Sequence, residues 1–168
     1  MITVAVVGSG CCSTEEERLA EELGRRLAEA GALVVTGGLT GVMEAACRGA
    51  QSAGGTTVGL LPGESRAEAN PWVTVAVPTG LGEGRNVLLA RAADVLVAVG
   101  GEYGTLSEIA LALKLGRPVI GLATWELRRH AGAAPDPGVQ RASDPARAVE
   151  LAVGLAQRAG APRGRPGA

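Results

Sequence analysis

Short apolar runs alternate along the chain with longer segments in which apolar residues recur every three or four positions. Runs of four to six apolar residues are typical of buried strands, whereas the longer spacing is that of helices with one buried face. Strands that alternate with helices predict βαβ units, in which parallel strands are connected through helices. We therefore expect an α/β protein, a Rossmann-like three-layer sandwich with a central parallel sheet.

Ser13 and Thr14 are each followed by Glu three residues later, which predicts two overlapping capping boxes at the first helix. Asp144, before Pro145, is the expected N-cap of the last helix. The pattern predicts strands at residues 3–7, 33–36, 57–61, 73–77, 95–99 and 119–122, and helices at residues 14–30, 42–50, 85–92, 105–115 and 145–158. Residues 124–144 contain Pro and Gly without a clear period and are expected to form a surface loop. We expect one nucleotide-binding domain over residues 1–159 and a flexible C-terminal tail over residues 160–168.

The composition limits the classes of function. The chain has 168 residues, no Phe, one Tyr and two Trp, so its core is aliphatic and it lacks the aromatic platforms that stack single-stranded bases. The net charge is −1, and 15 Arg and one Lys are scattered among 17 acidic residues, which gives no basic surface for nucleic acid. The apolar runs are much shorter than the ~20 residues that span a bilayer. We therefore expect a cytoplasmic protein without a nucleic-acid or membrane partner.

The cysteines give no sign of a metal site. Cys11 and Cys12 are adjacent, Cys47 lies far along the chain, and His130 is the single histidine. This arrangement matches no zinc-binding spacing, so we expect no metal.

Two glycine-rich loops carry the strongest functional signal, because each lies between an expected strand and an expected helix. Glycine lets the backbone approach a ligand closely, and the following helix start directs unpaired N–H groups and a positive dipole end at an anion. In an open parallel sheet, ligands bind at this carboxyl edge. We therefore expect both loops to hold one phosphate, with binding residues Gly8, Ser9, Gly37, Gly38, Thr40, Gly41, Asn86, Gly100, Gly101, Gly104 and Thr105.

Two familiar nucleotide-binding motifs are absent. No G-x-x-x-x-G-K-[ST] occurs, which excludes a P-loop NTPase. The first turn, Gly8-Ser9-Gly10, lacks the third glycine of G-x-G-x-x-G, and no acidic residue follows the second strand to bind a ribose diol. A dinucleotide-dependent dehydrogenase is therefore not expected.

Glu108 and Arg85 are the candidate catalytic residues, and each has a structural alternative. Glu108 follows Thr105 by three residues and is suited either to a capping box or to stabilising an oxocarbenium-like transition state beside a bound sugar. Arg85 opens an expected helix and is suited either to a surface ion pair or to binding phosphate or ribose.

The segment Gly100-Gly101-Glu102-Tyr103-Gly104-Thr105-Leu106-Ser107-Glu108 resembles the P-G-G-x-G-T-x-x-E motif of the Lonely Guy family. Members of that family are cytokinin riboside 5′-monophosphate phosphoribohydrolases, often mislabelled lysine decarboxylases. The resemblance extends from Ile2 to about Trp125 and matches Arg85 to the arginine of the family's M-H-x-R-K motif. Val99 replaces the proline of the first motif, and the segment around Arg85 lacks the histidine and lysine of the second.

Two further segments, Glu83-Gly84-Arg85-Asn86 and Glu68-Ala69-Asn70-Pro71, are more similar to a sister branch that includes molybdenum cofactor carrier proteins. The resemblance implies a small phosphorylated ligand and a homo-oligomer, either a dimer or a tetramer. No cofactor is expected to be required, and the expected ligand is a nucleotide or a molybdopterin-type molecule. Two functions remain open: hydrolysis of the N-glycosidic bond of purine nucleoside 5′-monophosphates, and non-catalytic carriage or sensing of a phosphorylated ligand such as molybdenum cofactor.

Overall fold

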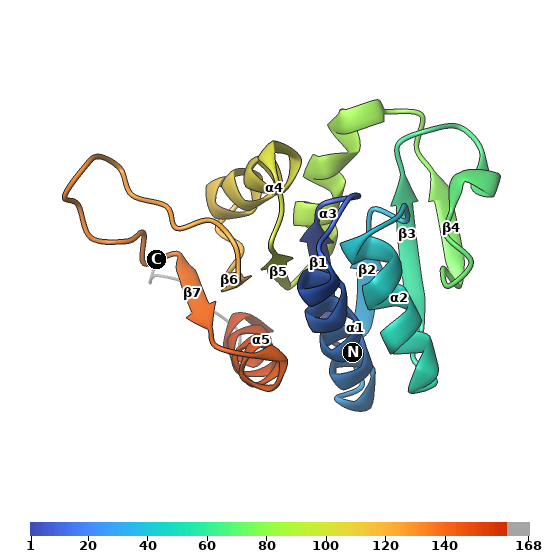
Figure 1. Cartoon of the computed structure of the whole chain (residues 1–168), viewed down its shortest axis with the longest axis horizontal. Coiled ribbons are helices and arrows are strands. Elements are labelled where there is room, and N and C mark those ends of the chain that lie inside the picture. Colours follow the sequence, from blue (N-terminus) through green and yellow to red (C-terminus); the bar gives the residue numbers. More distant parts are fainter. Residues whose placement is uncertain (161–168) are drawn as a thin grey trace, which may run out of the picture.

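Seven parallel strands form one central sheet in the computed structural model, which describes residues 1–160. The strand order is β4-β3-β2-β1-β5-β6-β7, and every neighbouring pair is parallel. The strands are β1 (Thr3–Gly8), β2 (Leu33–Thr36), β3 (Thr57–Leu61), β4 (Val75–Pro78), β5 (Val95–Val99), β6 (Val119–Leu122) and β7 (Val139–Ala142). The expected α/β class with a parallel sheet is confirmed (Figure 1).

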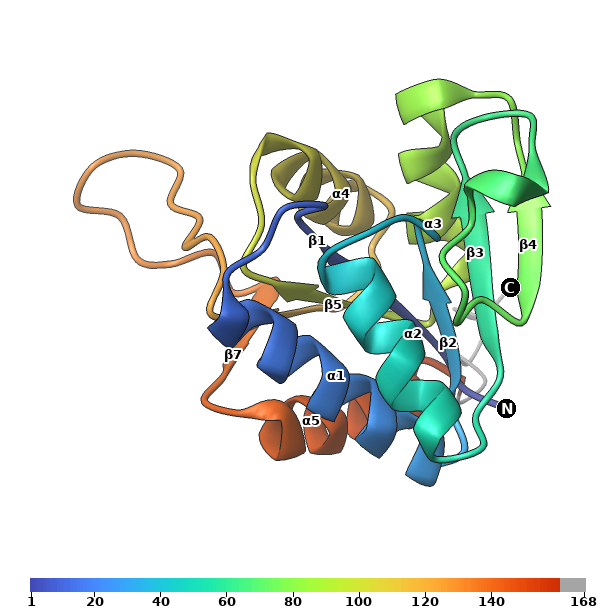
Figure 2. The same cartoon turned by 45° about the vertical axis from the view of Figure 1, so that its right-hand side comes forward.

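Helices cover both faces of the sheet and complete the three layers (Figures 1 and 2). The helices are α1 (Thr14–Glu29), α2 (Val42–Ser52), α3 (Asn86–Ala92), α4 (Tyr103–Lys114) and α5 (Pro145–Gly160), with short 3-10 helices at Arg66–Glu68 and Gly82–Arg85. Alternate residues of β1 point to opposite faces, so Val4 and Val6 pack with α1, α2 and α5, while Ala5 and Val7 pack with α3 and α4. The core is aliphatic, as expected.

The helix ends follow the sequence signals closely. Ser13 is the N-cap of α1, and its capping box with Glu16 is formed in both directions. Thr14 is the first residue of the helix, so the overlapping second box is not the one used. Asp144 accepts a hydrogen bond from the backbone N–H of Arg147 at 2.9 Å, as expected for an N-cap.

Several boundaries differ from the expectations; helix α4, for example, begins at Tyr103 rather than at residue 105. Residues 139–142, expected to lie in a loop, form the edge strand β7 beside β6. Strand β4 begins at Val75 rather than at residue 73, and a 3-10 turn over Gly82–Arg85 precedes α3. Gly160 is the last residue of α5, and residues 161–168 of the expected tail lie outside the described residues. No helix within residues 1–160 is both long and apolar enough to cross a membrane.

Candidate functional site

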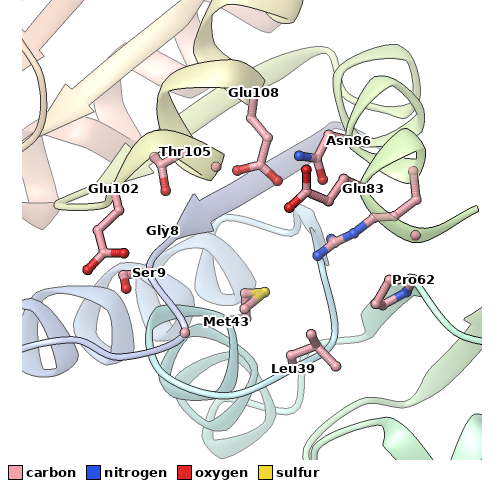
Figure 3. Close-up of a pocket in the computed structure, with 14 residues that line it drawn as sticks. Gly8, Ser9, Leu39, Met43, Pro62, Glu83, Asn86, Glu102, Thr105 and Glu108 are labelled. Carbon is pink, nitrogen blue, oxygen red and sulfur yellow. The ribbon is translucent and has the colours of Figure 1, made fainter.

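A cleft of about 290 Å³ lies at the carboxyl ends of β1 and its neighbouring strands (Figure 3). This edge is where an open parallel sheet binds ligands, because the loops after adjacent strands diverge there. The cleft is lined by Gly8, Ser9, Gly10, Leu39, Met43, Pro62, Gly82, Glu83, Arg85, Asn86, Glu102, Gly104, Thr105 and Glu108.

The structure brings part of the expected site together in this cleft. The expected residues that line it are Gly8, Ser9, Arg85, Asn86, Gly104, Thr105 and Glu108. The expected residues that do not line it are Gly37, Gly38, Thr40, Gly41, Gly100 and Gly101. The second group lies in the two glycine loops, so five of the six loop glycines do not line the cleft.

Close packing explains two of these glycines. A Cβ atom at Gly37 would lie 2.0 Å from Nη1 of Arg85, so a larger residue would displace the guanidinium group from its place against the first loop. A Cβ atom at Gly100 would lie 1.7 Å from a carboxylate oxygen of Glu16, the residue that closes the capping box of α1. Gly100 also has a φ of 52°, which favours glycine. These glycines shape the cleft from outside.

Glu108 is buried in the second turn of α4, with its carboxyl group directed into the cleft (Figure 3). Its side chain has no hydrogen-bond or ion-pair partner within the described part of the chain. Burial raises the pKa of this carboxyl from 4.5 to about 7, and the nearby charge of Arg85 opposes the rise. A neutral proton-bearing form is therefore populated near pH 7.

The capping-box alternative for Glu108 is wrong. The N-cap of α4 is Glu102, so Thr105 is the third residue of the helix and cannot serve as the cap that pairs with Glu108. The carboxyl group of Glu108 therefore does not bond to the start of the helix and faces the cleft.

Arg85 is buried at the end of the 3-10 turn, with 8% of its surface exposed. Its Nε and Nη1 atoms are buried and have no hydrogen-bond partner. Burial lowers the pKa of the guanidinium group, whereas the charge of Glu108 raises it. The surface ion-pair alternative is wrong, since no carboxylate within residues 1–160 lies within salt-bridge distance of Arg85. A buried guanidinium group with unused donors is costly unless an anion or polar ligand compensates it.

The two helix starts expected to share a phosphate differ in what they offer. The first N–H group of α2, on Val42, donates to the carbonyl of Ser9 at 3.0 Å. In α4, the first backbone donor that bonds within the helix is Leu106, to the carbonyl of Glu102, so the preceding N–H groups have no helical acceptor. Gly104 and Thr105 in that first turn line the cleft. In α2 the N–H groups of Met43 and Glu44 likewise precede the first donor that bonds within the helix, on Ala45, so the start of α4 has one more N–H group without an acceptor among the described residues.

Asn86 links the two helices that border the cleft. Its Nδ2 donates to the hydroxyl of Ser107 at 3.3 Å, and that hydroxyl donates to the carbonyl of Gly104 at 2.7 Å. The start of α3, and with it Arg85, is thereby tied to the first turn of α4.

Several residues that line the cleft were not among the expected site residues. Glu83 and Glu102 bring two more carboxyl groups to the cleft, and both lie inside the motifs that were recognised. Leu39, Met43 and Pro62 form an apolar wall on the side opposite Glu108 (Figure 3). No local pattern marks these three, because they converge from different segments.

Comparison with known proteins finds related sequences and structures that cover most of the chain. An uncharacterised protein of Archaeoglobus fulgidus is 42% identical over 122 residues, which cover 73% of this chain and 80% of that protein. The Moco carrier protein of Chlamydomonas reinhardtii is 36% identical with a TM-score of 0.80, and the match covers 94% of this chain and 98% of that chain. The molybdenum cofactor binding protein of Rippkaea orientalis is 34% identical with a TM-score of 0.79, over 92% of this chain and 95% of that chain.

The expected place of the chain among short Rossmann-like proteins that include molybdenum cofactor carriers is confirmed. The model of one family matches residues 1–149, which include every residue that lines the cleft. The chain belongs to the SLOG cluster4 family.

Proposed function

We propose that this protein binds a small phosphorylated ligand of the molybdenum cofactor type in the cleft and carries it without chemical conversion. The observation that carries the proposal is the buried guanidinium group of Arg85, whose Nε and Nη1 have no partner, in the wall of a cleft bordered by an open helix start. The similarity to proteins described as molybdenum cofactor carriers supports the cargo.

The phosphate of the ligand is assigned to the first turn of α4, beside Gly104 and Thr105. Backbone N–H groups and the positive end of the helix dipole favour an anion there. Ser9, on the facing loop, lines the same region of the cleft, while its hydroxyl donates to the backbone carbonyl of Cys11 at 2.8 Å. Arg85 then balances the ligand's charge from the opposite side.

Glu83 and Glu108 lie toward the other end of such a ligand, whereas Glu102, the N-cap of α4, lies beside the proposed phosphate position (Figure 3). Glu83, Glu102 and Glu108 outnumber the single arginine, so a ligand that is anionic throughout would be repelled. A pterin ring offers N–H donors, and the carboxylate of Glu83 can accept hydrogen bonds from them. The apolar wall of Leu39, Met43 and Pro62 offers a surface for the planar face of the ring. Phosphate at one end and N–H donors at the other match this distribution.

Binding of molybdenum cofactor to wild-type protein and to Arg85→Met tests the proposal. Equilibrium dialysis against cofactor released from a denatured molybdoenzyme, with bound pterin measured by fluorescence after oxidation, gives the affinity. We expect Arg85→Met to weaken binding by about a hundredfold, because a charge-assisted contact contributes about 1.5 to 3 kcal/mol. Arg91→Met is the matched control, because Arg91 is exposed on α3. No binding by the wild-type protein, or equal binding by Arg85→Met, would contradict the proposal.

A second candidate function is the hydrolysis of nucleoside 5′-monophosphates, which one observation favours. Glu108 is buried beside the cleft with a pKa of about 7, close to the value that suits acid–base chemistry at neutral pH. In this reaction water adds its hydroxyl to C1′ of the ribose, and the bond from C1′ to the base nitrogen breaks. The base leaves with the proton, which gives free base and ribose 5-phosphate.

Release of base from AMP and related monophosphates decides between the two functions. If the protein is a hydrolase, Glu108→Gln should reduce turnover far more than it reduces binding, because the carboxylate acts on charge that develops in the transition state. Base release that survives Glu108→Gln would remove the catalytic role of this residue. Binding without base release would leave the carrier function.

We also propose a homo-oligomer, a dimer or a tetramer. Val75 and Val77 lie on one face of the edge strand β4, with 47% and 38% of their surface exposed. Their partners in register are Val58 and Leu60 of β3, which are only partly buried. An apolar sheet face of this kind is stabilised when a second subunit covers it.

A further inference from the structure

The carbonyl oxygens of both glycine loops are bound by donors from later segments of the chain. In the first loop, the backbone N–H of Asn70 donates to Gly38 and its side-chain Nδ2 donates to Leu39, both at 2.8 Å. In the second loop, Nε1 of Trp125 donates to the carbonyl of Gly101 at 3.1 Å. Neither Asn70 nor Trp125 lines the cleft, so these carbonyls are held from outside it.

Asn70 is buried and fully engaged. Only 8% of its surface is exposed, and its Oδ1 accepts a hydrogen bond from the backbone N–H of Trp72 at 3.1 Å, which fixes the orientation of the amide. It belongs to the Glu68–Pro71 segment that the sequence analysis singled out and that the proposed function leaves without a role. Its bonds end on the loop whose Gly37 packs against Arg85. Asn70 therefore binds the loop within two residues of the glycine that packs against the guanidinium group.

The second loop is held by a strained turn after β6. Ala123 has a φ of 51°, the single non-glycine residue with a positive φ within residues 1–160. This conformation is uncommon for residues with a side chain and persists where the surroundings enforce it. It turns the chain so that Thr124 donates to the carbonyl of Gly100 and Trp125 to that of Gly101. The ring of Trp125 also lies 5.8 Å from that of Tyr103, at the first residue of α4.

These contacts matter because a carbonyl oxygen carries partial negative charge and repels an anion. A glycine loop is flexible enough to turn its carbonyls toward a ligand site unless donors hold them elsewhere. We infer that Asn70 and Trp125 are positioning residues of the phosphate cleft, which keep the loop carbonyls away from the ligand and hold the first loop against Arg85. This inference rests on the proposed function, since it assigns these residues to the same anion site.

Two nearly isosteric variants remove one donor each. Asn70→Asp keeps the oxygen that accepts from the N–H of Trp72, but it places a second oxygen opposite the carbonyl of Leu39. Trp125→Phe keeps an aromatic ring beside Tyr103 but lacks the Nε1–H group that donates to Gly101. Asp94→Ala is the control, because Asp94 accepts the backbone N–H of Thr3 at the opposite end of the sheet. Loss of this hydrogen bond lowers the stability of the protein without removing a contact to either glycine loop.

Hydrogen exchange gives a readout that needs no ligand. The amide of Gly38 donates to Thr36 at 3.0 Å and that of Gly100 donates to Leu122 at 3.1 Å, so both report on loop order. We expect faster exchange at Gly38 in Asn70→Asp and at Gly100 in Trp125→Phe, with no change at either amide in Asp94→Ala.

Equilibrium dialysis with molybdenum cofactor gives the second readout. Asn70→Asp and Trp125→Phe should each bind about tenfold more weakly than wild type, whereas Asp94→Ala should bind equally well. Wild-type affinity in both loop variants, or unchanged exchange at Gly38 and Gly100, would overturn the inference. If the wild-type protein binds no cofactor, the proposed function fails, and the exchange rates alone decide whether Asn70 and Trp125 hold the loops.

Discussion

Replacing Glu108 with Gln should stabilise the folded protein, and the gain should grow with pH. Glu108 is 6% exposed, and its pKa rises from 4.5 to about 7 on folding because burial disfavours the carboxylate. Between these two values the folded state binds more protons than the unfolded state, so the free energy of unfolding falls as pH rises. The stabilising effect of the protonated carboxyl is thus fully present below about pH 4.5 and is lost as pH rises through about 7.

The size of the effect follows from the interval between the two pKa values. At about 1.4 kcal/mol per pH unit, the wild-type protein loses about 3 kcal/mol of unfolding free energy between pH 4.5 and pH 8. The loss at pH 5 is still below about 1 kcal/mol. Gln has nearly the same shape as Glu but does not ionise, so Glu108→Gln avoids this loss.

Urea denaturation of wild type and Glu108→Gln at pH 5 and pH 8, in buffer without phosphate, measures the difference. We expect Glu108→Gln to be more stable by about 3 kcal/mol at pH 8 and by less than about 1 kcal/mol at pH 5. Glu64→Gln is the control, because Glu64 is exposed and its replacement should change stability by less than about 0.5 kcal/mol. If the free energies of unfolding of wild type and Glu108→Gln differ by the same amount at both pH values, the carboxyl group of Glu108 is not buried without a partner.

Three further predictions concern the ligand and the assembly. Binding of molybdenum cofactor should strengthen by roughly fivefold as pH falls from 8 to 6.5, because protonation of Glu108 removes a negative charge from the cleft. The pH dependence of binding should be weaker in Glu108→Gln, and the dependence that remains there measures the protonation of the ligand's own phosphate. Gly104→Val should weaken binding of AMP or molybdenum cofactor by about tenfold. The melting temperature should stay nearly unchanged, since a Cβ at Gly104 meets no atom within 4 Å and Val is the better helix former. If the variant binds both ligands as tightly as the wild-type protein does, the first turn of α4 is not the binding site. Sedimentation velocity at micromolar concentration should show a dimer or tetramer, and a monomer would contradict the proposed assembly.

Much of the fold could be predicted because the strands that form the centre of the sheet are continuous apolar runs. Residues 95–99 are all buried, and such a run between helical segments has few other interpretations. The edge strand β7 could not be found in this way, because Val139–Ala142 contains Gln and Arg and is only partly buried. Its strand conformation depends on pairing with β6, which is information about tertiary structure.

The candidate site was predictable where chemistry and local pattern coincide. Glu108 and Thr105 follow the second glycine loop at fixed spacing and line the cleft as expected. The role of Gly37 was not predictable, since it depends on the approach of Arg85, which lies 48 residues further along the chain. The same is true of Asn70 and Trp125, whose bonds to the loops join segments that are distant in sequence.

A crystal structure of the protein with molybdenum cofactor tests the central claim most directly. We expect the phosphate at the first turn of α4, within hydrogen-bonding distance of the backbone N–H groups of Gly104 and Thr105, with the guanidinium group of Arg85 facing the ligand. A second cavity of about 280 Å³, lined in part by Cys11, Cys12 and Arg48, lies on the other side of Gly10 and offers a place where the ligand is not expected. Cofactor bound there, or in the cleft with its phosphate away from α4, would show that the start of α4 is not the phosphate site.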